Sequence, residues 1–414
     1  DAMPPLKRLA LRLPIPPLAA KREQLTSPAP NTVEWSTLIG AAIGGDGSDL
    51  DVPEISQDDI ALILYTSGTT GKPKGALLSH GNLIANAIQG KAWVPQMSKQ
   101  QERFLAALPI FHAYGMTTLC IFSIYLGAEL ILVPSPQMPL IMDIVKKRTP
   151  TWLPGVPTLY QKIMDAAEEK DVDLSGIRNA FSGAATLPVE IVERWEALTG
   201  GRLVEGFGMT ETSPVLTANP MNGKHRPGYV GVPFPDTEVR IANPENLDET
   251  QPDGQPGEML ARGPQIFQGY FGNAAATEKT FHNGWFRTGD MALMEPDGYI
   301  KLVSRIKEII ITGGFNVYPA EVEEAIAEHP DVVDVAAVGR PRQDGSEDVV
   351  GCVTLRDGAV LDPEGLKEFC RERLTRYKVP RTFYHFEDLA RDHLGKIRRH
   401  QVRKDLLELL GTKA

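Results

Sequence analysis

The run YTSGTTGKPKG at residues 65–75 contains residue types that could hold a phosphate group. Glycine allows backbone N–H groups to approach phosphate oxygens, while hydroxyl and ammonium groups supply further donors. The run is not a Walker A loop, because the GxxxxGK(S/T) spacing fails from both Gly68 and Gly71, and a strand rather than a helix is expected after it. By itself it predicts a surface turn and a phosphate-binding loop about equally well. The candidate contacts are Thr66, Ser67, Gly68, Thr69, Thr70, Gly71 and Lys74.

Length, charge and cysteine content exclude several classes of protein. A chain of 414 residues exceeds what one hydrophobic core usually organises, so we expect at least two domains. A net charge of −10 offers no general attraction for nucleic acid, so an anionic ligand needs a local binding site. The cysteines, Cys120, Cys352 and Cys370, form no CxxC pair and indicate neither a zinc site nor a disulfide framework.

The sequence predicts a soluble protein. It has no stretch with the roughly 18 to 20 apolar residues of a membrane span, and its first residues lack a signal-peptide pattern. Residues 6–25, LKRLALRLPIPPLAAKREQL, mix leucines with basic residues as membrane-surface segments do, but Pro14, Pro16 and Pro17 limit any helix there to about two turns. We therefore expect a cytoplasmic protein, with peripheral contact at the inner face of the membrane as an alternative.

The elements around the glycine-rich run predict that it joins two strands. Residues 60–65 are typical of a short buried strand, and residues 76–78 of a second one. A helix is expected from about residue 82, with His80 or Asn82 near its cap.

The rest of the chain predicts an α/β protein with a separate C-terminal part. From residue 103 to 204 strand and helix patterns alternate, as in a layered α/β domain, and short Gly- and Pro-rich strands at 228–262 favour a small β-barrel or distorted sheet. Beyond residue 304 the pattern is that of a small α+β domain. The strands are expected at 104–108, 130–133, 180–182, 309–311, 332–338 and 349–355, and the helices at 158–169, 189–198, 363–374, from Pro319, and at the basic C-terminus.

Seven blocks of the sequence closely resemble, in order, those of the acyl-activating, adenylate-forming superfamily, which includes acyl-CoA synthetases, firefly luciferase and peptide-synthetase adenylation domains. They are YTSGTTGKPKG, LPIFHAYG (108–115), SGAATLP (182–188), EGFGMTETSP (205–214), GWFRTGD (284–290), SRIKEIIITGGFNVYPAEVEEAI (304–326) and LGKIRRH (394–400). The resemblance spans residues 55–405 and implies an acyl-CoA synthetase-like α/β fold. That fold has a large N-terminal α/β domain with layered sheets and a small distorted β-barrel, plus a small mobile C-terminal α+β domain.

The resemblance also implies a domain division. Residues 1–54 would be a partial lead-in, because most of the family's N-terminal subdomain is missing. Residues 55–304 would form the AMP-binding domain, and residues 305–414 the C-terminal lid.

By resemblance, the block EGFGMTETSP binds the nucleotide. Phe207 would stack on adenine, Thr210 would contact the α-phosphate and Glu211 would bind Mg²⁺, a hard cation that prefers carboxylate and phosphate oxygens. Outside this context Glu211 is typical of a surface acid. The other residues assigned to the nucleotide site are Gly183, Ala184, Ala185, Glu205, Gly206, Gly208 and Met209.

Asp290 and Arg305 are expected to bind the ribose. By resemblance, Asp290 accepts hydrogen bonds from both ribose hydroxyls and Arg305 reaches the same sugar. Taken alone, an aspartate after a glycine is usually a turn residue.

Lys396 is the residue expected to assist catalysis most directly. The resemblance implies that it bridges the attacking carboxylate and the α-phosphate during adenylation. The alternative is a solvated helix face, because Lys396 lies in a basic run.

Two further residues have a role by resemblance and a simpler alternative. Lys307 matches the family's hinge or is simply an exposed lysine, and His112 gates the acyl pocket or is a core histidine. Gly313 and Gly314 would line the pantetheine channel.

Together these blocks predict a Mg²⁺- and ATP-dependent ligase that converts a carboxylic acid to acyl-AMP and then, with CoA, to acyl-CoA. The stretch PMNGKHRPGYVGVPFPDTEVRIAN at 220–243 adds a resemblance to bacterial long-chain fatty acyl-CoA ligases. The alternatives are an aryl- or medium-chain acyl-CoA ligase, a luciferase-like oxygenase, and a non-catalytic nucleotide- or partner-binding relative or inactive fragment. The sequence specifies neither an oligomeric state nor an acyl chain length.

Overall fold

The computed structural model describes residues 53–66, 73–342, 346–392 and 395–411, together with Pro16, Ala19, Val33 and Thr37. The predicted contacts Ser67, Gly68, Thr69, Thr70 and Gly71 lie outside the described residues, as does nearly all of the predicted lead-in. Ser56–Ala414 group as one compact unit. The predicted domain boundary after residue 304 stays a prediction.

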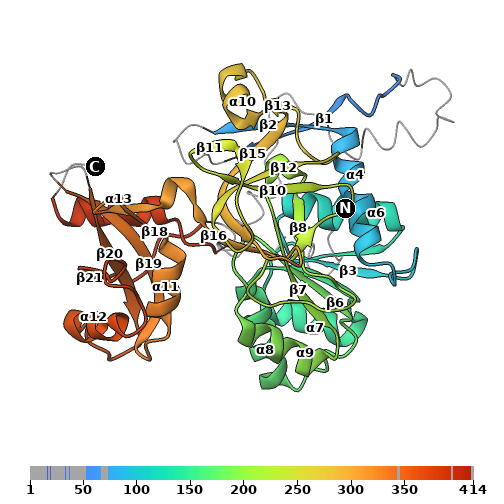
Figure 1. Cartoon of the computed structure of the whole chain (residues 1–414). Helices are drawn as coiled ribbons and strands as arrows, with labels where there is room; N and C mark the ends of the chain where they lie inside the picture. The colour runs from blue at the N-terminus through green and yellow to red at the C-terminus, as the bar shows by residue number, and fades with distance from the viewer. Residues whose placement is uncertain are drawn as a thin grey trace. The chain divides into compact units, whose positions relative to one another are not determined.

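A seven-stranded sheet forms the centre of the first half of the chain, in the order β4-β3-β5-β6-β7-β8-β9. Its first five strands are parallel, and β8 and β9 are antiparallel additions. Figure 1 shows α7, α8 and α9 grouped on one side of this sheet and α4 and α6 on the other. The strands are β3 (Arg103–Ala106), β4 (Glu129–Leu132), β5 (Trp152–Gly155), β6 (Asn179–Ser182), β7 (Arg202–Gly208), β8 (Val215–Ala218) and β9 (Val232–Pro233).

The helices bury their apolar faces against this sheet. Trp195 of α9 and Tyr160 of α8 are fully buried and stack edge to face with ring centroids 5.0 Å apart, an arrangement that contributes beyond the area it buries. The predicted alternation of strands and helices is therefore confirmed, with small shifts of the boundaries. The helices are α4 (His80–Trp93), α6 (Phe122–Leu126), α7 (Met138–Arg148), α8 (Pro157–Lys170) and α9 (Val189–Thr199).

The glycine-rich run joins β1 (Ile60–Thr66) to β2 (Lys74–Ser79) in an antiparallel pair, as predicted. The prediction that residues 60–65 form a buried strand was wrong about burial, because Ile60, Ile63 and Tyr65 are 40%, 37% and 66% exposed. β1 is the edge strand of a small sheet, β1-β2-β13, in which β13 is Gly269–Tyr270. Only the other face of β1, with Leu62 and Leu64, packs against the core.

The cap of α4 lies beside the residues predicted near it. Ser79 is the N-cap residue, directly before His80, and it forms a capping box with Asn82. The Ser79 hydroxyl accepts from the Asn82 N–H at 3.1 Å, and the Asn82 side chain accepts from the Ser79 N–H at 3.0 Å.

The Gly- and Pro-rich middle region forms part of a six-stranded antiparallel sheet with register shifts in several strand pairs, in agreement with the predicted distorted sheet. The order is β11-β10-β12-β15-β14, with β16 paired to β15. Its strands are β10 (Glu238–Asn243), β11 (Asn246–Thr250), β12 (Gly257–Arg262), β14 (Phe281–His282), β15 (Trp285–Met294) and β16 (Ile300–Arg305).

The C-terminal part is built on a three-stranded sheet, β19-β20-β21. Alternate residues of β19 enter different cores: Val335 and Ala337 face one cluster, and Ala336 and Val338 face the other. Because both faces of the sheet are covered, successive residues along its strands are mostly apolar. The elements are β17 (Ile310–Thr312), β18 (Phe315–Val317), α11 (Pro319–Ala327), β19 (Val332–Pro341), β20 (Glu347–Leu355), α12 (Pro363–Arg371), β21 (Thr382–His385) and α13 (Arg399–Leu409).

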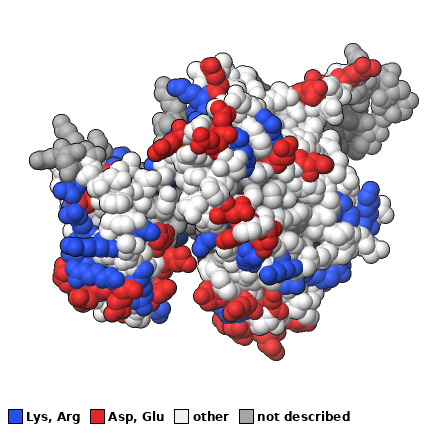
Figure 2. All heavy atoms as spheres, viewed as in Figure 1, with Lys and Arg blue, Asp and Glu red and all other residues white. Residues whose placement is uncertain are grey.

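Figure 2 shows acidic and basic side chains interspersed over the visible face. Among the described residues, none of the helices is both long enough and apolar enough to cross a membrane.

One acid is buried at the carboxyl end of the parallel strands. Glu205 of β7 lies opposite Ser182 of β6 and is 7% exposed. Burial raises its pKa to about 8, although a hydrogen bond from the Leu187 N–H acts in the opposite direction. The folded protein therefore holds this carboxyl protonated at a pH where an unfolded chain ionises it.

We expect Glu205→Gln to make stability less dependent on pH. The pKa of Glu205 in the folded protein exceeds its unfolded value of about 4.3. Its contribution to the free energy of unfolding is therefore complete below about pH 4.3 and is lost as the pH rises through about 8. Urea unfolding followed by tryptophan fluorescence measures the free energy of unfolding. Between pH 4.5 and 8.5 this free energy should rise in the variant relative to the wild type by a few kcal/mol, since one pKa unit is worth about 1.36 kcal/mol. Glu193→Gln, at an exposed position of α9, is the control. A difference between variant and wild type that does not change with pH would contradict this prediction.

Candidate active site

A cavity of about 580 Å³ opens at the carboxyl ends of β5, β6 and β7. Parallel strands all end at the same edge of a sheet, and the loops that follow them commonly form ligand sites. Residues of β15, β16 and the turn before α13 complete the lining. The predicted site residues that line this cavity are Ala184, Ala185, Glu205, Gly206, Phe207, Gly208, Asp290, Arg305 and Lys396.

Asp290 and Arg305 face each other across the β15–β16 pair. The Arg305 Nε lies 3.0 Å from Asp290 Oδ1, and Asp290 is 4% exposed. Its other oxygen, Oδ2, is buried and has no hydrogen-bond partner. Burial raises the pKa of Asp290, while the nearby cations Arg305 and Lys396 act against this shift. A buried acceptor without a partner suits a ligand that brings hydroxyl donors.

Lys396 projects from a turn that fixes its backbone. The Lys396 N–H donates to Asp392 Oδ1 at 3.0 Å, and its carbonyl accepts from the Asp392 N–H at 2.9 Å. Arg391 Nη1 donates to the Gly395 carbonyl at 2.9 Å, where Gly395 has a φ of +84° that favours glycine. The side chain is solvent-accessible because it lines the open cavity. Even so, the surrounding protein and the Arg305 guanidinium lower the pKa of its ammonium group.

The end of β7 carries the predicted nucleotide block. Phe207 and Gly208 line the cavity, and the chain then turns into a short helix, η2 (Thr210–Thr212). Met209, Thr210 and Glu211 are half-buried but do not line the cavity. The Glu211 Oε1 accepts a hydrogen bond from the Tyr270 hydroxyl at 2.7 Å.

Lys74 lies near the same tyrosine. Its Nζ is 4.9 Å from the centre of the Tyr270 ring, within the range of a cation–π contact. Thr66 donates to the Lys74 carbonyl at 3.4 Å. Both ends of the predicted phosphate-binding run therefore lie close to β13, whose Tyr270 contacts Glu211.

Glu211 fits a magnesium ion that is shared with a phosphate ligand. Among the described residues, no group of three or more His, Cys, Asp or Glu side chains could form a complete metal cage. Mg²⁺ is commonly held by only one or two carboxylates together with substrate phosphates and water. Glu211, a single half-buried carboxylate beside the predicted phosphate-binding run, matches that donor set.

Five further predicted residues also lie outside this cavity. Lys307 is exposed in η3 (Ile306–Glu308), and Gly313 and Gly314 form the exposed turn between β17 and β18. Gly183 packs against Tyr114, since a Cβ atom on it would lie 3.3 Å from the ring. His112 caps the short helix α5 (Ala113–Gly115) through Nδ1, which accepts from the Tyr114 N–H at 3.2 Å.

The sequence reasoning missed several charged residues of the cavity wall. Glu308, Arg391 and Arg399 all line it. Arg399 belongs to the basic run for which a solvated helix face was the alternative interpretation. Its pKa is raised by ion pairs with Glu323 and Glu308, which outweigh the lowering by burial. The acids lie 76 and 91 residues before it, so the sequence carried no local signal for these contacts.

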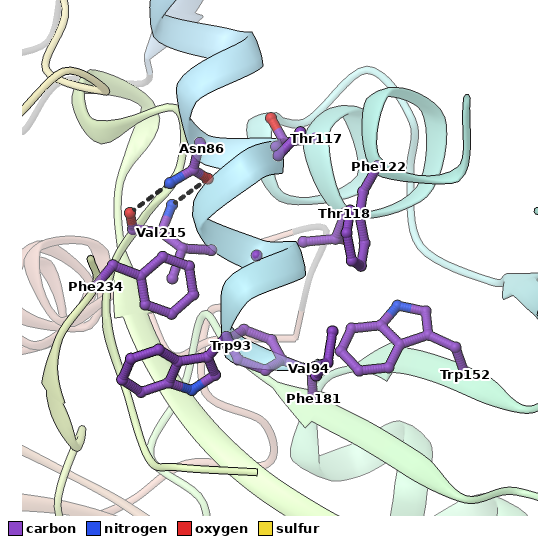
Figure 3. A pocket seen from close by; sticks show the side chains of 12 residues that line it. Asn86, Trp93, Val94, Thr117, Thr118, Phe122, Trp152, Phe181, Val215 and Phe234 are labelled. Carbon is purple, nitrogen blue, oxygen red and sulfur yellow. Dashed lines mark hydrogen bonds between the residues drawn. The ribbon is translucent and has the colours of Figure 1, made fainter. Parts of the chain in front are cut away.

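A second, apolar pocket of about 30 Å³ lies between α4, η1 (Met116–Ile121) and the central sheet (Figure 3). Asn86 at its edge exchanges two hydrogen bonds with the Val215 backbone. Aromatic rings form most of its wall, namely Trp93, Phe122, Trp152, Phe181 and Phe234.

Tyr114 lines neither cavity but contacts residues next to both. Its hydroxyl donates to the carbonyls of Gly155, at 3.2 Å, and Phe181. Its ring packs beside Gly183, the neighbour of the cavity residue Ala184. Burial raises the pKa of Tyr114 far above its ordinary value, so the hydroxyl remains a donor to these carbonyls.

Comparison with known proteins identifies relatives along most of the chain. The long-chain-fatty-acid–CoA ligase of Bacillus subtilis (strain 168) is 40% identical over 360 residues, which are 87% of this chain and 64% of the ligase. The chain therefore spans slightly less than two thirds of the length of this ligase.

Solved structures with the same architecture contain ATP. ATP-bound MatB from Rhodopseudomonas palustris is 32% identical with a TM-score of 0.81, over 90% of this chain and 73% of MatB. The o-succinylbenzoate–CoA synthetase of Bacillus subtilis, in complex with ATP and magnesium ion, is 28% identical with a TM-score of 0.76, over 86% of this chain and 72% of that protein. These neighbours confirm the predicted acyl-CoA synthetase-like fold.

Two family models match the chain in sequence. The model described as AMP-binding enzyme matches residues 10–271, and the model described as AMP-binding enzyme C-terminal domain matches residues 321–396. The first match alone covers more than half of the chain, and it contains the Phe207 and Glu211 block, while the second ends at Lys396. The chain therefore belongs to the AMP-binding enzyme family.

Proposed function

We propose that the protein activates a carboxylic acid with ATP, forming acyl-AMP and pyrophosphate, and then transfers the acyl group to CoA with release of AMP. The observation that carries this proposal is the buried, unpartnered Oδ2 of Asp290, in a cavity that also holds Arg305 and Lys396. This acceptor and the two cations are what a ribose and a phosphate would require.

The nucleotide lies in the larger cavity in this proposal. Phe207 stacks on adenine against the small residues Ala184 and Ala185, and Asp290 accepts from the ribose hydroxyls. Thr210 contacts the α-phosphate, and residues 66–74 cover the β- and γ-phosphates. Glu211 holds Mg²⁺, which when bound neutralises phosphate charge.

Lys396 assists the first half-reaction. A carboxylate oxygen of the acid attacks the α-phosphorus, and the bond to the bridging oxygen of pyrophosphate breaks. The Lys396 ammonium donates to the carboxylate and to the α-phosphate as charge shifts between them. In the second half-reaction the CoA sulfur attacks the acyl carbon, AMP leaves with the bonding electrons, and the thiol proton passes to solvent.

The second step requires Lys396 to leave the acyl carbon accessible. We propose Lys307 as the hinge for this movement and the Gly313-Gly314 turn as part of the pantetheine channel. Both are exposed, so neither is held in a packed core in the arrangement described.

The apolar pocket near Tyr114 favours an acid with a hydrophobic acyl group, and we propose that this acid is a fatty acid. The fatty-acid ligase relative favours this choice. At about 30 Å³ the pocket is small, so a long chain needs the aromatic wall to open. The relative that acts on o-succinylbenzoate favours an aryl acid as the second candidate.

His112, beside Tyr114, would lie at the entrance of the apolar pocket.

We further propose a cytoplasmic enzyme, with peripheral membrane contact as an alternative.

The function is tested by measuring pyrophosphate release with ATP, Mg²⁺ and a panel of acids. We expect palmitate and similar fatty acids to support the fastest release, and acyl-CoA to form only when CoA is added. Benzoate or coumarate outpacing palmitate would favour the aryl ligase, and oxygen uptake would favour a luciferase-like oxygenase. Absence of acyl-AMP with every acid would favour a non-catalytic role or an inactive fragment, and activity restored by an N-terminal extension would identify the fragment.

Lys396→Ala should separate the two half-reactions. Because the ammonium is needed only while charge moves onto phosphate, acyl-AMP formation should fall by about 10²- to 10³-fold. Thioester formation from supplied acyl-AMP should remain within a few-fold of the wild type. Equal loss in both assays would remove Lys396 from the assigned role.

Gly90→Leu should shorten the accepted acyl chain. A Cβ atom on Gly90 would lie 3.7 Å from the Phe122 ring, so the larger side chain would fill the apolar pocket. The ratio of kcat/KM for a long over a short fatty acid should fall at least tenfold, since such pockets discriminate one methylene by about 1–3 kcal/mol. Ile88→Leu, on the exposed face of α4, is the control, and an unchanged ratio in Gly90→Leu would place the acyl chain elsewhere.

A further inference from the structure

Three charged side chains beside Lys396 have no part in the roles given above. Arg399, the first residue of α13, donates from Nε and Nη2 to both carboxylate oxygens of Glu323, at 2.6 and 2.5 Å. Its Nη1 donates to Glu308 Oε2 at 2.7 Å. The planar guanidinium can make such two-sided contacts, whereas a lysine ammonium cannot reproduce the fork. Arg399 therefore holds two carboxylates at once.

Glu323 anchors this cluster to the C-terminal sheet. It lies on α11, and its Oε1 also accepts from the Ala337 N–H of β19 at 2.9 Å. The side chains of Glu323 and Arg399 are 15% and 23% exposed. The guanidinium is thus positioned by packed elements and not by a mobile surface contact.

Glu308 is the member of the cluster that shares the cavity with Lys396. It lies in η3, directly after the proposed hinge residue Lys307, and lines the cavity wall together with Arg399 and Lys396. It is also close enough to Asp290 to influence that carboxylate. Without Arg399, Glu308 would be an unpaired anion in the space proposed for phosphate.

The charges around Lys396 oppose one another. The surrounding protein lowers the pKa of its ammonium most, and Arg305 and Arg399 lower it further, while Asp290 and Glu308 raise it. Arg391 and Lys162 add two more cations to the cavity wall. An isolated Glu308 carboxylate would gain by pairing with Lys396, because a partly buried charge is stabilised by an opposite one.

We propose that Arg399 is a positioning residue for Lys396: by holding Glu308 against Glu323 and α11, it prevents that carboxylate from capturing the Lys396 ammonium. The ammonium then remains available to the substrate carboxylate and the α-phosphate. The same contact ties the segment after Lys307 to the helix that follows Lys396, so a rotation at the hinge carries both together. The catalytic consequence rests on the proposed function, whereas the control of Lys396 by Glu308 does not.

Chemical labelling of the nucleotide-free protein tests the inference without relying on activity. Acetic anhydride reacts with neutral amines, and peptide mass spectrometry gives the rate at Lys396. In Arg399→Met the freed Glu308 should raise the pKa of Lys396, which slows labelling at fixed pH by about tenfold for each unit. Adding Glu308→Gln to Arg399→Met should return the rate toward that of the wild type, a recovery that general loss of packing would not produce.

Arg403→Met is the matched control for this experiment. Arg403 lies one turn further along α13 and pairs with Glu347 at 2.6 Å, but it does not line the cavity. Its removal breaks a comparable ion pair and should leave Lys396 labelling unchanged. Should Arg399→Met not fold, Arg399→Lys, which cannot bridge both carboxylates, should slow labelling to a smaller extent. Unchanged labelling in the folded Arg399 variant, or no recovery in the double variant, overturns the proposal.

The half-reactions give a second, independent readout. Arg399→Met should reduce acyl-AMP formation by about 10²-fold, comparable with loss of one preorganised donor, and should leave thioester formation from supplied acyl-AMP within a few-fold. The double variant with Glu308→Gln should recover much of the rate of acyl-AMP formation. Equal loss in both half-reactions overturns the assigned role. A wild type that forms no acyl-AMP contradicts the proposed function instead, and the labelling result still decides whether Arg399 restrains Glu308.

Discussion

The ion pair between Asp290 and Arg305 is the contact on which the site depends. The antiparallel register of β15 and β16 sets the two residues opposite each other and turns both toward the cavity. Arg305 satisfies one oxygen of the aspartate and leaves the other buried without a partner. An unmet acceptor of this kind costs roughly 1–3 kcal/mol. It is tolerated because Arg305 and Lys396 stabilise the charge, and a ligand with hydroxyl donors would satisfy it.

The other parts of the cavity are arranged around this pair by secondary structure. The parallel strands β5, β6 and β7 bring their carboxyl ends to one edge, where Phe207 and the small residues Ala184 and Ala185 face the same space. The turn that carries Lys396 is tied by Asp392 and Arg391, and Arg399 connects the start of α13 to α11 and η3. Three of the cations along this wall form ion pairs with acids: Arg305 with Asp290, Arg391 with Asp334, and Arg399 with Glu308 and Glu323.

The fold and the residue types of the site followed from the sequence to a large extent. The alternation of strands and helices, the hairpin around the glycine-rich run and the helix beginning at Pro319 were all predicted near their observed bounds. The failed prediction of a buried strand has a physical cause. Residues 60–65 have the composition of a core strand, yet they form the edge of a three-stranded sheet, and composition does not reveal which strand lies at an edge.

By itself, the sequence determined the α/β class, the order of the elements and a set of residues suited to phosphate, ribose and a carboxylate. The class and the order follow from periodicity and turn chemistry, which act over a few residues, and the roles of the residues follow from the resemblance of the sequence blocks to a known superfamily. Only the tertiary structure decided which of these residues share one cavity, that an apolar pocket lies apart from it, and that Arg399 pairs with Glu308 and Glu323. These are contacts between residues tens of positions apart, and packing, charge pairing and burial in three dimensions select them.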